Sequence, residues 1–329
     1  MNIDGSEIII IGGTGSLGKA LLNCFLTKHK PKGIRIFSRD ELKQWELRKK
    51  IQNEFPGAPV SFLIGDIRDR KRIEMASRNT DVMIHCSALK QVPSCENNPI
   101  EAIKTNILGS QNVLFAALEN NVKKVMAIST DKAVYPINLY GATKLCMERL
   151  FIDGNVYSGG RLPAFSCCRY GNVIGSRGSV IPLFKKQFSE TGTITITDSR
   201  MTRFWIALES VAKFIVRMIN VMEGGEIFVP LMPSSSIEDL AKAVVPDAVI
   251  KYTGIRPGEK LHETLITAEE SRRTCLRSDG HGNYYVIKKD EPEFETDNPL
   301  AAFEYSSNKN IRLLEVAEMK KLINDAAIE

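Results

Sequence analysis

The 329-residue chain lacks a long hydrophobic run, an excess of one charge and any internal repeat. No apolar segment approaches the roughly 20 residues that a membrane-spanning helix requires, so we expect no membrane span and a cytoplasmic location. The net charge is a modest +5, and the basic residues are scattered along the chain. A nucleic-acid-binding protein usually gathers such residues in a stripe, so this distribution argues against nucleic acid as a partner.

Cysteine and histidine patterns that would indicate disulfides or metal ligands are also missing. The chain has seven cysteines without a CxxC pair, several of them inside apolar runs, and four histidines that do not pair with them at metal-ligand spacing. This usage is typical of a reducing compartment, where buried cysteines act as small hydrophobic side chains. We predict no metal site. With 43% hydrophobic residues, the chain can fold as one large domain or two smaller ones.

A strand, a glycine-rich turn and a helix are predicted near the N-terminus, in that order. The run 7–11, apolar from residue 8 onward, leads directly into GGTGSLG and then into a segment with helical apolar periodicity. In a dinucleotide site such glycines permit a tight turn, let the backbone approach a pyrophosphate and let the helix pack on the strand. The free N–H groups of the helix then face that anion. The predicted pyrophosphate site comprises Gly12, Thr14, Gly15, Ser16, Leu17 and Gly18.

The turn after the second predicted strand, 34–37, favours NADP over NAD. An NAD site usually has an acidic residue here for the ribose 2′-hydroxyl. This chain has Ser38 and Arg39, and a hydroxyl plus a guanidinium suits a 2′-phosphate. The alternative is that Arg39 faces solvent and that Asp40 binds the ribose of NAD. Asp40 is also predicted to be the N-cap of a helix that runs to residue 53. The predicted cofactor site continues through Glu41, Leu42 and Lys43.

Two further strands, 60–64 and 82–85, are expected to end at the same sheet edge. Asp66, followed by Ile67, is placed to accept a hydrogen bond from the adenine amine. Cys86 opens the loop after the next strand, and this loop would run along the cofactor. Lys90 on that loop would reach either the nicotinamide ribose or a substrate phosphate, unless it is an ordinary solvated lysine. We include all four residues in the predicted cofactor site.

The segment STDKAVYPINLYGATK carries the densest set of groups that can move protons. Tyr140 and Lys144 in it are spaced as neighbours on one helical face, after a proline that suits a helix start. A lysine ammonium beside a phenol would lower the phenol pKa from its usual value of about 10. A YxxxK motif alone is weak evidence, and the alternative is an incidental pair on a solvated helix. The upstream glycine fingerprint favours the catalytic interpretation.

The same segment begins with an acid and a base side by side. Thr130, Asp131 and Lys132 follow the fifth predicted strand, 125–129, at the sheet edge where the cofactor would lie. An aspartate and a lysine there are candidates for general acid and general base. The alternative is an ion pair that only closes the turn.

The alternation of strands and helices over the first ~180 residues predicts an α/β fold with a doubly wound parallel (Rossmann) sheet. We expect an NADP-binding domain over 1–175 and a smaller region over 176–329 that ends in a helix at 313–326. Segments that follow residue 175 can also belong to the first domain. A long amphipathic helix is predicted over 99–119. The glycine-rich run 172–179 is expected to be a loop that leaves the sheet and offers backbone amides to an anion.

Together, the GxxGxxG and YxxxK motifs resemble the extended short-chain dehydrogenase/reductases that act on nucleotide sugars. More narrowly, the chain resembles the UDP-N-acetylglucosamine 4,6-dehydratases, and most of all the inverting, 5-epimerising branch that begins pseudaminic acid synthesis. The resemblance covers nearly the whole chain. Tyr135 and Cys86-Ser87 depart from the usual pattern of that branch. The matching stretches are GGTGSLGK, FSRDELKQ, GDIRD, ALKQVPSCENNP, STDKA, PINLYGATKL, RYGNVIGSRGSVIP, MTRFWI, GEIFVP and GIRPGEKLHE.

This resemblance implies a reaction in which NADP is regenerated at each turnover and is tightly bound. Tyr140, assisted by Thr130, would remove the C4 hydroxyl proton while the C4 hydride leaves, and Lys144 would hold the nicotinamide ribose. Lys132 would then remove the C5 proton while a protonated Asp131 releases the C6 hydroxyl as water. Hydride return to C6 and reprotonation of C5 from the other face would complete the inversion. This scheme predicts a raised pKa for Asp131 and a lowered pKa for Lys132.

The resemblance also implies a pocket for the UDP-sugar and an assembly of identical subunits. The arginines of this pocket would bind the diphosphate, although spacing alone leaves ordinary surface charge as an alternative. Dimers or hexamers are expected, through the helices that follow Pro99 and Pro136. A retaining dehydratase, a UDP-sugar 4-epimerase and a non-catalytic NADP-binding protein stay open as alternatives. The expected substrate residues are Lys90, Lys132, Asn172, Val173, Ser176, Arg177, Arg203, Arg256 and Glu259.

Overall fold

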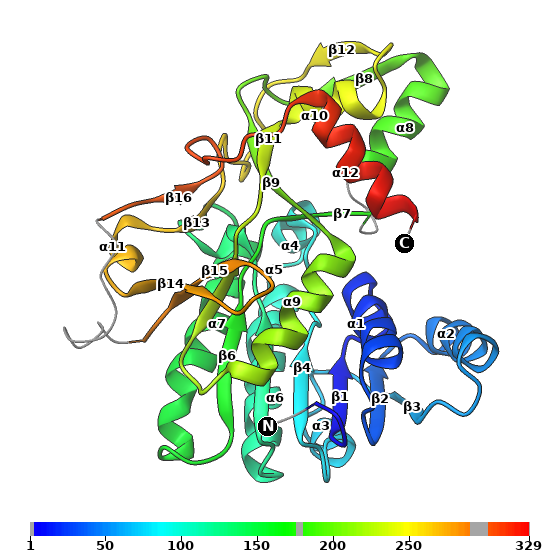
Figure 1. The fold of residues 1–329 in the computed structure, drawn as a ribbon, viewed down its shortest axis with the longest axis vertical. Helices are drawn as coiled ribbons and strands as arrows, with labels where there is room; N and C mark the ends of the chain where they lie inside the picture. Colours follow the sequence, from blue (N-terminus) through cyan, green and yellow to red (C-terminus); the bar gives the residue numbers. More distant parts are fainter. Residues whose placement is uncertain (1–2, 176–179, 290–301, 329) are drawn as a thin grey trace.

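The computed structural model describes residues 3–175, 180–289 and 302–328, and its described part is built around one large sheet (Figure 1). This sheet has nine strands in the order β14-β15-β10-β6-β5-β4-β1-β2-β3. The strands from β3 to β10 run parallel, while β15 and β14 are antiparallel additions at one edge. The bounds are β1 Glu7–Ile11, β2 Gly33–Ser38, β3 Val60–Ile64, β4 Val82–His85, β5 Lys124–Ile128, β6 Ala164–Cys168, β10 Ile227–Pro230, β14 Thr274–Ser278 and β15 Asn283–Ile287.

The strand order reverses between β1 and β4, and this places a crevice at the carboxyl ends of these strands. β1 pairs with β2 on one side and with β4 on the other, with Ile8 opposite Ile34 and Val82. Its run of isoleucines is fully buried, because helices cover both faces of the sheet. The doubly wound α/β prediction is confirmed.

Two layers of helices cover the sheet. α1 packs against α9 on one face, and α3, α6 and α7 form the other layer (Figure 1). Among the described residues, no helix combines the length and the apolar character needed to cross a membrane. The helix bounds here are α1 Ser16–Lys28, α2 Glu41–Glu54, α3 Arg70–Ala76, α4 Val92–Asn97, α5 Pro99–Ile103, α6 Gly109–Glu119, α7 Leu139–Asp153 and α9 Leu208–Val221, with short turns η2 Asp131–Ala133 and η3 Gly154–Ser158.

The predicted helix over 99–119 is confirmed, and it contains an unpredicted π-helical turn, η1 Lys104–Leu108, between α5 and α6. Asn106 lies in this turn and is buried. Its side-chain amide donates to the Leu89 carbonyl at 2.9 Å and to the Thr143 hydroxyl at 3.0 Å. Its oxygen accepts from the Leu89 amide at 2.8 Å. A π turn of this kind shifts a side chain by one position, and here it fixes the loop that carries Lys90.

A second hydrophobic cluster, which includes Phe184, Trp205 and Met319, lies beyond the sheet edge where β1 and β5 end. The predicted last helix begins three positions later than expected, at Val316. Strands β10, β14 and β15, all from after residue 176, join the main sheet. The remaining elements are α8 Val180–Thr191, α10 Ile237–Val244, α11 Ala268–Ser271, α12 Val316–Ile328, β7 Asn172–Ile174, β8 Thr193–Ile196, β9 Thr202–Ala207, β11 Ser234–Ser236, β12 Val249–Tyr252, β13 Thr264–Ile266 and β16 Tyr305–Ser306.

Candidate active site

The glycine turn after β1 has the close backbone approach that its sequence predicts. Gly12 has φ +85°, and a Cβ there would lie 2.8 Å from the Ser87 hydroxyl and 2.9 Å from the Ser87 nitrogen. A Cβ at Gly18 would lie 2.5 Å from the Gly13 Cα. Neither position accepts a side chain. Gly15 is the N-cap of α1 and makes no side-chain cap. A helix N-terminus at such a crevice is a common binding position for an anion.

The turn after β2 holds its polar residues in a defined arrangement. Asp40 caps α2 by accepting from the Lys43 amide at 3.0 Å, which confirms its predicted N-cap role, and it also contacts the Lys43 ammonium. The Ser38 hydroxyl accepts from Gln44 at 3.0 Å. The Arg39 guanidinium is half exposed and lies 3.5 Å from Asp66. Burial opposes the ionisation of Asp66, but Arg68 and Arg39 outweigh it and lower the pKa of this carboxyl.

Asp131 is fully buried in η2, directly after β5. Its Oδ1 accepts from the Thr130 hydroxyl at 2.9 Å and from the Lys132 ammonium at 3.0 Å. Its Oδ2 has no hydrogen-bond partner among the described residues. Burial raises the pKa of Asp131, and the charge of Glu263 adds to this effect. The predicted raised pKa is confirmed.

Lys132 lies between two carboxylates rather than beside one. Its ammonium is 3.0 Å from Asp131 Oδ1 and 3.4 Å from Glu263 Oε1. Burial alone would lower the pKa of Lys132, but the two negative charges outweigh it and raise the pKa. The predicted lowered pKa is therefore wrong, because Asp131 and Glu263 together outweigh the effect of burial.

Tyr140 and Lys144 lie on α7, which packs directly against η2. A Cβ at Gly141 would lie 2.1 Å from the Lys132 carbonyl oxygen, so only glycine allows this approach. Burial raises the pKa of Tyr140 to about 12, although Lys132 and Thr130 act in the opposite direction. The Lys144 ammonium donates to the Ile128 carbonyl at 2.6 Å, and its pKa is lowered by burial to about 8. The expectation that Lys144 lowers the phenol pKa is wrong in this structure, where Lys132 is the cation that acts on Tyr140.

The loop 254–263, from the C-terminal part of the chain, contacts residues 129–144, which we call the catalytic segment. The Lys260 ammonium donates to the Val134 carbonyl at 2.6 Å, and Asn138 donates to the Gly258 carbonyl at 2.8 Å. Arg256 on this loop is exposed and lies 3.1 Å from Glu259. Glu259 in turn lies 3.8 Å from the Arg203 guanidinium. Two predicted substrate residues of this loop are therefore held near the catalytic segment.

The other expected substrate residues differ in their surroundings. Arg203 lies in β9, buried, where it donates to the carbonyls of Thr202, Lys260 and Leu261, so it is not an ordinary surface charge. Lys90 is partly desolvated, and burial together with the nearby charge of Lys132 lowers its pKa. Asn172 and Val173 begin β7. The predicted residues Ser176 and Arg177 lie outside the described residues.

Several buried polar atoms around η2 have no hydrogen-bond partner in the described part of the chain. They are Ser129 Oγ, Asp131 Oδ2, Asn172 Oδ1 and Glu263 Oε2. Asp131 and Glu263 share Lys132, and Gly171, which precedes Asn172, would place a Cβ 3.4 Å from Asp131 Oδ2. Buried polar groups are nearly always paired, so such a cluster indicates a site for a polar ligand.

Comparison with known proteins identifies the group to which this chain is related. Residues 8–289 match the family model described as polysaccharide biosynthesis protein. The chain belongs to this family. The UDP-N-acetylglucosamine 4,6-dehydratase (inverting) of Campylobacter jejuni subsp. jejuni serotype O:2 is 45% identical over 332 residues, which are 97% of each chain. The resemblance inferred from the motifs is confirmed.

Two further comparisons concern a relative that is named as a different enzyme and a solved structure. The UDP-glucose 4-epimerase of Rickettsia akari is 41% identical over 96% of this chain and 94% of its own. The X-ray structure of Pen from Bacillus thuringiensis superposes with a TM-score of 0.89 at 36% identity, over 99% of this chain and 100% of that one. The overall fold is therefore that of a solved family member.

Glu263 belongs to the candidate site of this chain but was not among the predicted site residues. It stands one position before the apolar run of β13, at the end of the matched stretch GIRPGEKLHE. An acidic residue directly against a buried strand is a signal for a paired or functional carboxylate. Glu259, the acidic residue predicted for this stretch, has the same charge but faces the exposed Arg256.

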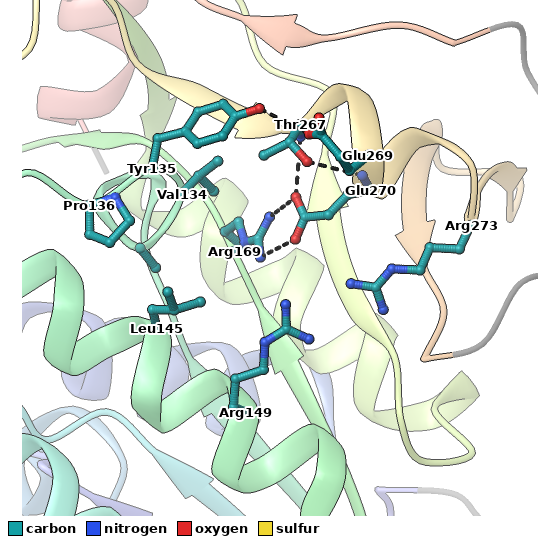
Figure 2. A pocket seen from close by; sticks show the side chains of 11 residues that line it. Val134, Tyr135, Pro136, Leu145, Arg149, Arg169, Thr267, Glu269, Glu270 and Arg273 are labelled. Atoms are coloured by element: carbon teal, nitrogen blue, oxygen red, sulfur yellow. Dashed lines mark hydrogen bonds and ion pairs between the residues drawn. The ribbon is translucent and has the colours of Figure 1, made fainter.

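A cavity of about 300 Å³ borders residues 133–136 of the loop between β5 and α7, which we call the catalytic loop (Figure 2). None of the candidate catalytic residues Asp131, Lys132 and Tyr140 lines this cavity. Tyr135 and Glu270 contribute to its wall. Tyr135 has φ +44° and donates its hydroxyl to Glu269 at 3.1 Å. This contact fixes the loop between η2 and α7 against α11. The cavity thus lies between the catalytic loop and α11, which this contact holds together.

Proposed function

We propose that this protein dehydrates UDP-N-acetylglucosamine with inversion at C5, to UDP-2-acetamido-2,6-dideoxy-β-L-arabino-hex-4-ulose, as the first step of pseudaminic acid synthesis in the cytoplasm. The observation that carries this proposal is the gathering of Asp131, Lys132 and Tyr140 on η2 and the start of α7. These elements follow β5 at the crevice edge, and several buried polar atoms around them make no hydrogen bond to any described residue. The dehydratase relative from Campylobacter supports the same reaction.

The residues at the crevice fit a nicotinamide dinucleotide. The glycine turn leaves no room for a Cβ at Gly12, and the start of α1 offers amides to a pyrophosphate. Lys144 is assigned to the nicotinamide ribose, and Ser38 with Arg39 to a 2′-phosphate. When bound, the nicotinamide supplies a temporary acceptor for the hydride that leaves C4 and returns to C6.

The proton steps are assigned to residues of this chain. Tyr140, assisted by Thr130, takes the C4 hydroxyl proton, and Lys132 takes the C5 proton. Asp131 gives a proton to the C6 hydroxyl, which leaves as water. Lys132 must be neutral and Asp131 protonated for this step. Transfer of one proton along their 3.0 Å hydrogen bond produces both states at once, without exchange with solvent.

The substrate is assigned to the region between η2 and the loop 254–263. Arg256 and Lys90 suit the diphosphate by charge. Asn172, whose Oδ1 is unpaired in the described structure, suits a hydroxyl or amide of the sugar. Arg203 is already bonded to the backbone of the same loop, so its role is to shape the pocket beside Glu259.

A UDP-sugar 4-epimerase is the second candidate, because the Rickettsia relative carries that name at 41% identity. Incubation with UDP-N-acetylglucosamine without added cofactor, followed by proton NMR, separates the candidates. We expect a new C6 methyl signal and an H5 coupling pattern changed by inversion. A C4 epimer without a methyl group would support the epimerase. A methyl group with unchanged C5 configuration would indicate a retaining dehydratase, and no turnover would support a non-catalytic binding protein.

A substitution of Arg39 tests the prediction that this protein binds NADP in preference to NAD. We expect Arg39→Ala to weaken NADP⁺ binding by about tenfold or more, because a charge-assisted bond to a phosphate is lost, and to change NAD⁺ binding little. Dissociation constants for both dinucleotides, measured by calorimetry on protein freed of nucleotide, check this. Arg48→Ala is the control, since Arg48 lies on α2 over the Phe62 ring. Equal binding of NADP⁺ by Arg39→Ala and wild type would instead assign the ribose to Asp40 and favour NAD.

We also propose that identical subunits assemble as dimers or hexamers through α5 and α7. Ile100 on α5 is 65% exposed, and Leu108, at the end of η1, is 47% exposed. Exposed apolar side chains of this size are often covered in an assembly.

A further inference from the structure

Glu263 is a buried carboxylate surrounded by three cations. It is 2% exposed and immediately precedes β13. Its Oε1 lies 3.4 Å from the Lys132 ammonium and 3.9 Å from the Arg203 guanidinium, and its Oε2 lies 3.5 Å from the Lys260 ammonium. Oε2 has no hydrogen bond to any described residue. A buried charge needs such compensation, and here the compensation includes the proposed catalytic base.

We propose that Glu263 is a positioning residue of the reaction, which holds the Lys132 ammonium beside Asp131 and sets the charge of that pair. This inference rests on the proposed function, because it assigns Glu263 a role through Lys132 and Asp131. No direct contact between Glu263 and the reacting carbons is needed.

The geometry explains why Lys132 needs a second anchor. A lysine ammonium ends a flexible four-carbon chain, and the side chain of Lys132 is still 27% exposed. Asp131 contacts the ammonium from within the same turn, whereas Glu263 contacts it from a segment more than a hundred residues later in the chain. The two carboxylates together confine the ammonium to one position. Without Glu263, the ammonium would be free to turn towards solvent.

Glu263 is itself held in place by elements on two sides. Its backbone amide donates to the Ser307 hydroxyl at 2.9 Å. Arg203 in β9 is fixed by backbone carbonyls, including that of Lys260 at 3.0 Å. Lys260 donates to the Val134 carbonyl, which belongs to the catalytic loop. The carboxylate therefore links β9, the loop 254–263 and the catalytic loop at the point where Lys132 lies.

The charge of Glu263 acts on both members of the catalytic pair in the same direction. Charged groups surround the Glu263 carboxylate on several elements. Asp131 and Lys132 lie on η2, Arg203 lies on β9, and Glu259 and Lys260 lie on the same loop as Glu263. Lys90, on the loop before α4, lies near Lys132. Burial opposes the ionisation of Glu263, but Lys132, Arg203 and Lys260 lower the pKa of this carboxyl, so it stays charged. That charge raises the pKa of Lys132 and adds to the raised pKa of Asp131. Removing it lowers both pKa values.

Three variants test this role: Glu263→Gln, which keeps the shape but removes the charge, Glu263→Asp, which keeps the charge, and the control Glu226→Gln. Glu226 accepts from the Gly224 amide at 2.8 Å and precedes β10, at the opposite edge of the sheet. For Glu263→Gln we expect kcat to fall at least about tenfold, with KM for UDP-N-acetylglucosamine changed by less than about threefold. The pH profile of kcat/KM should move to lower pH by about one unit.

Glu263→Asp should keep the wild-type pH profile with an intermediate kcat, and Glu226→Gln should keep both wild-type values. A wild-type kcat and pH profile in Glu263→Gln would overturn the inference. A fall in kcat that only follows the loss of folded protein, measured by circular dichroism, with an unmoved pH profile would also overturn it, because it would show a purely structural role.

A measurement without turnover separates this inference from the proposed function. The rate at which an amine-acylating reagent modifies Lys132, followed by peptide mass spectrometry over pH, reports the pKa of that lysine even in an inactive protein. We expect the modification of Lys132 in Glu263→Gln to begin at lower pH than in the wild type. An identical pH dependence would overturn the inference, whereas a wild type without turnover but with the expected shift would contradict only the dehydratase proposal.

Discussion

Lys132→Ala is expected to lower the rate of product formation by about 10²- to 10⁴-fold, because the proposed general base for the C5 proton is removed. Tyr140 stays in place in this variant, so oxidation at C4 should still occur. The reduced nicotinamide should then accumulate on the protein, and its near-ultraviolet absorbance measures it. Product is quantified by NMR of the C6 methyl signal. The combination of lost product and retained reduction assigns Lys132 to the second step.

Lys123→Ala provides the matched control for Lys132→Ala. Lys123 also forms an ion pair, 2.8 Å from Asp81, but it precedes β5 and so lies at the opposite edge of the sheet. We expect nearly wild-type turnover in this control. Product formed by Lys132→Ala at close to the wild-type rate would show that Lys132 is not the base.

Arg169→Met is expected to destabilise the fold by about 3–5 kcal/mol, because it leaves buried carboxylates without a counter-charge. The Arg169 guanidinium is fully buried at the end of β6 and contacts Glu148 on α7 at 2.7 Å. It also contacts Glu270 on α11 at 2.9 Å (Figure 2). It also donates to the Leu265 carbonyl at 2.8 Å. These contacts fix α7, which carries Tyr140, against the C-terminal segments. Denaturant unfolding followed by circular dichroism measures the loss.

Arg70→Met is the surface control for this effect. Arg70 lies 2.6 Å from Glu74, but its side chain is half exposed, and solvent-exposed pairs contribute little to stability. We expect a much smaller loss than for Arg169→Met. Equal losses for the two variants would contradict the structural role given to the buried Arg169 pair.

The parts of the fold that were predicted correctly have local signals in the sequence. The isoleucines of β1 read as a strand buried on both faces, and the structure buries them completely. The glycine turn and the Asp40 cap are likewise local, because each depends on residues within a few positions. The π turn at Asn106 was missed because its cause is tertiary, namely hydrogen bonds to Leu89 and Thr143.

The charge state of the site could not be predicted from the catalytic segment alone. Asp131 and Lys132 are adjacent in the sequence, so their contact was foreseeable. Glu263 reaches the same ammonium from a distant segment, and its charge adds to that of Asp131 in raising the Lys132 pKa. The burial of Arg203 in β9 has the same origin, since the partners of its guanidinium come mainly from residues 260–263. No local pattern identifies the partners of such long-range contacts.

The central claim is that one hexose ring is oxidised at C4, loses water across C5 and C6, and is reduced at C6 within a single site built by Asp131, Lys132 and Tyr140. UDP-N-acetylglucosamine labelled with deuterium at C4 tests it most directly, with the product analysed by NMR and mass spectrometry. The account predicts that the label appears in the C6 methyl group and that C5 gains hydrogen from solvent. A label that stays at C4, or that is lost to solvent, would contradict it.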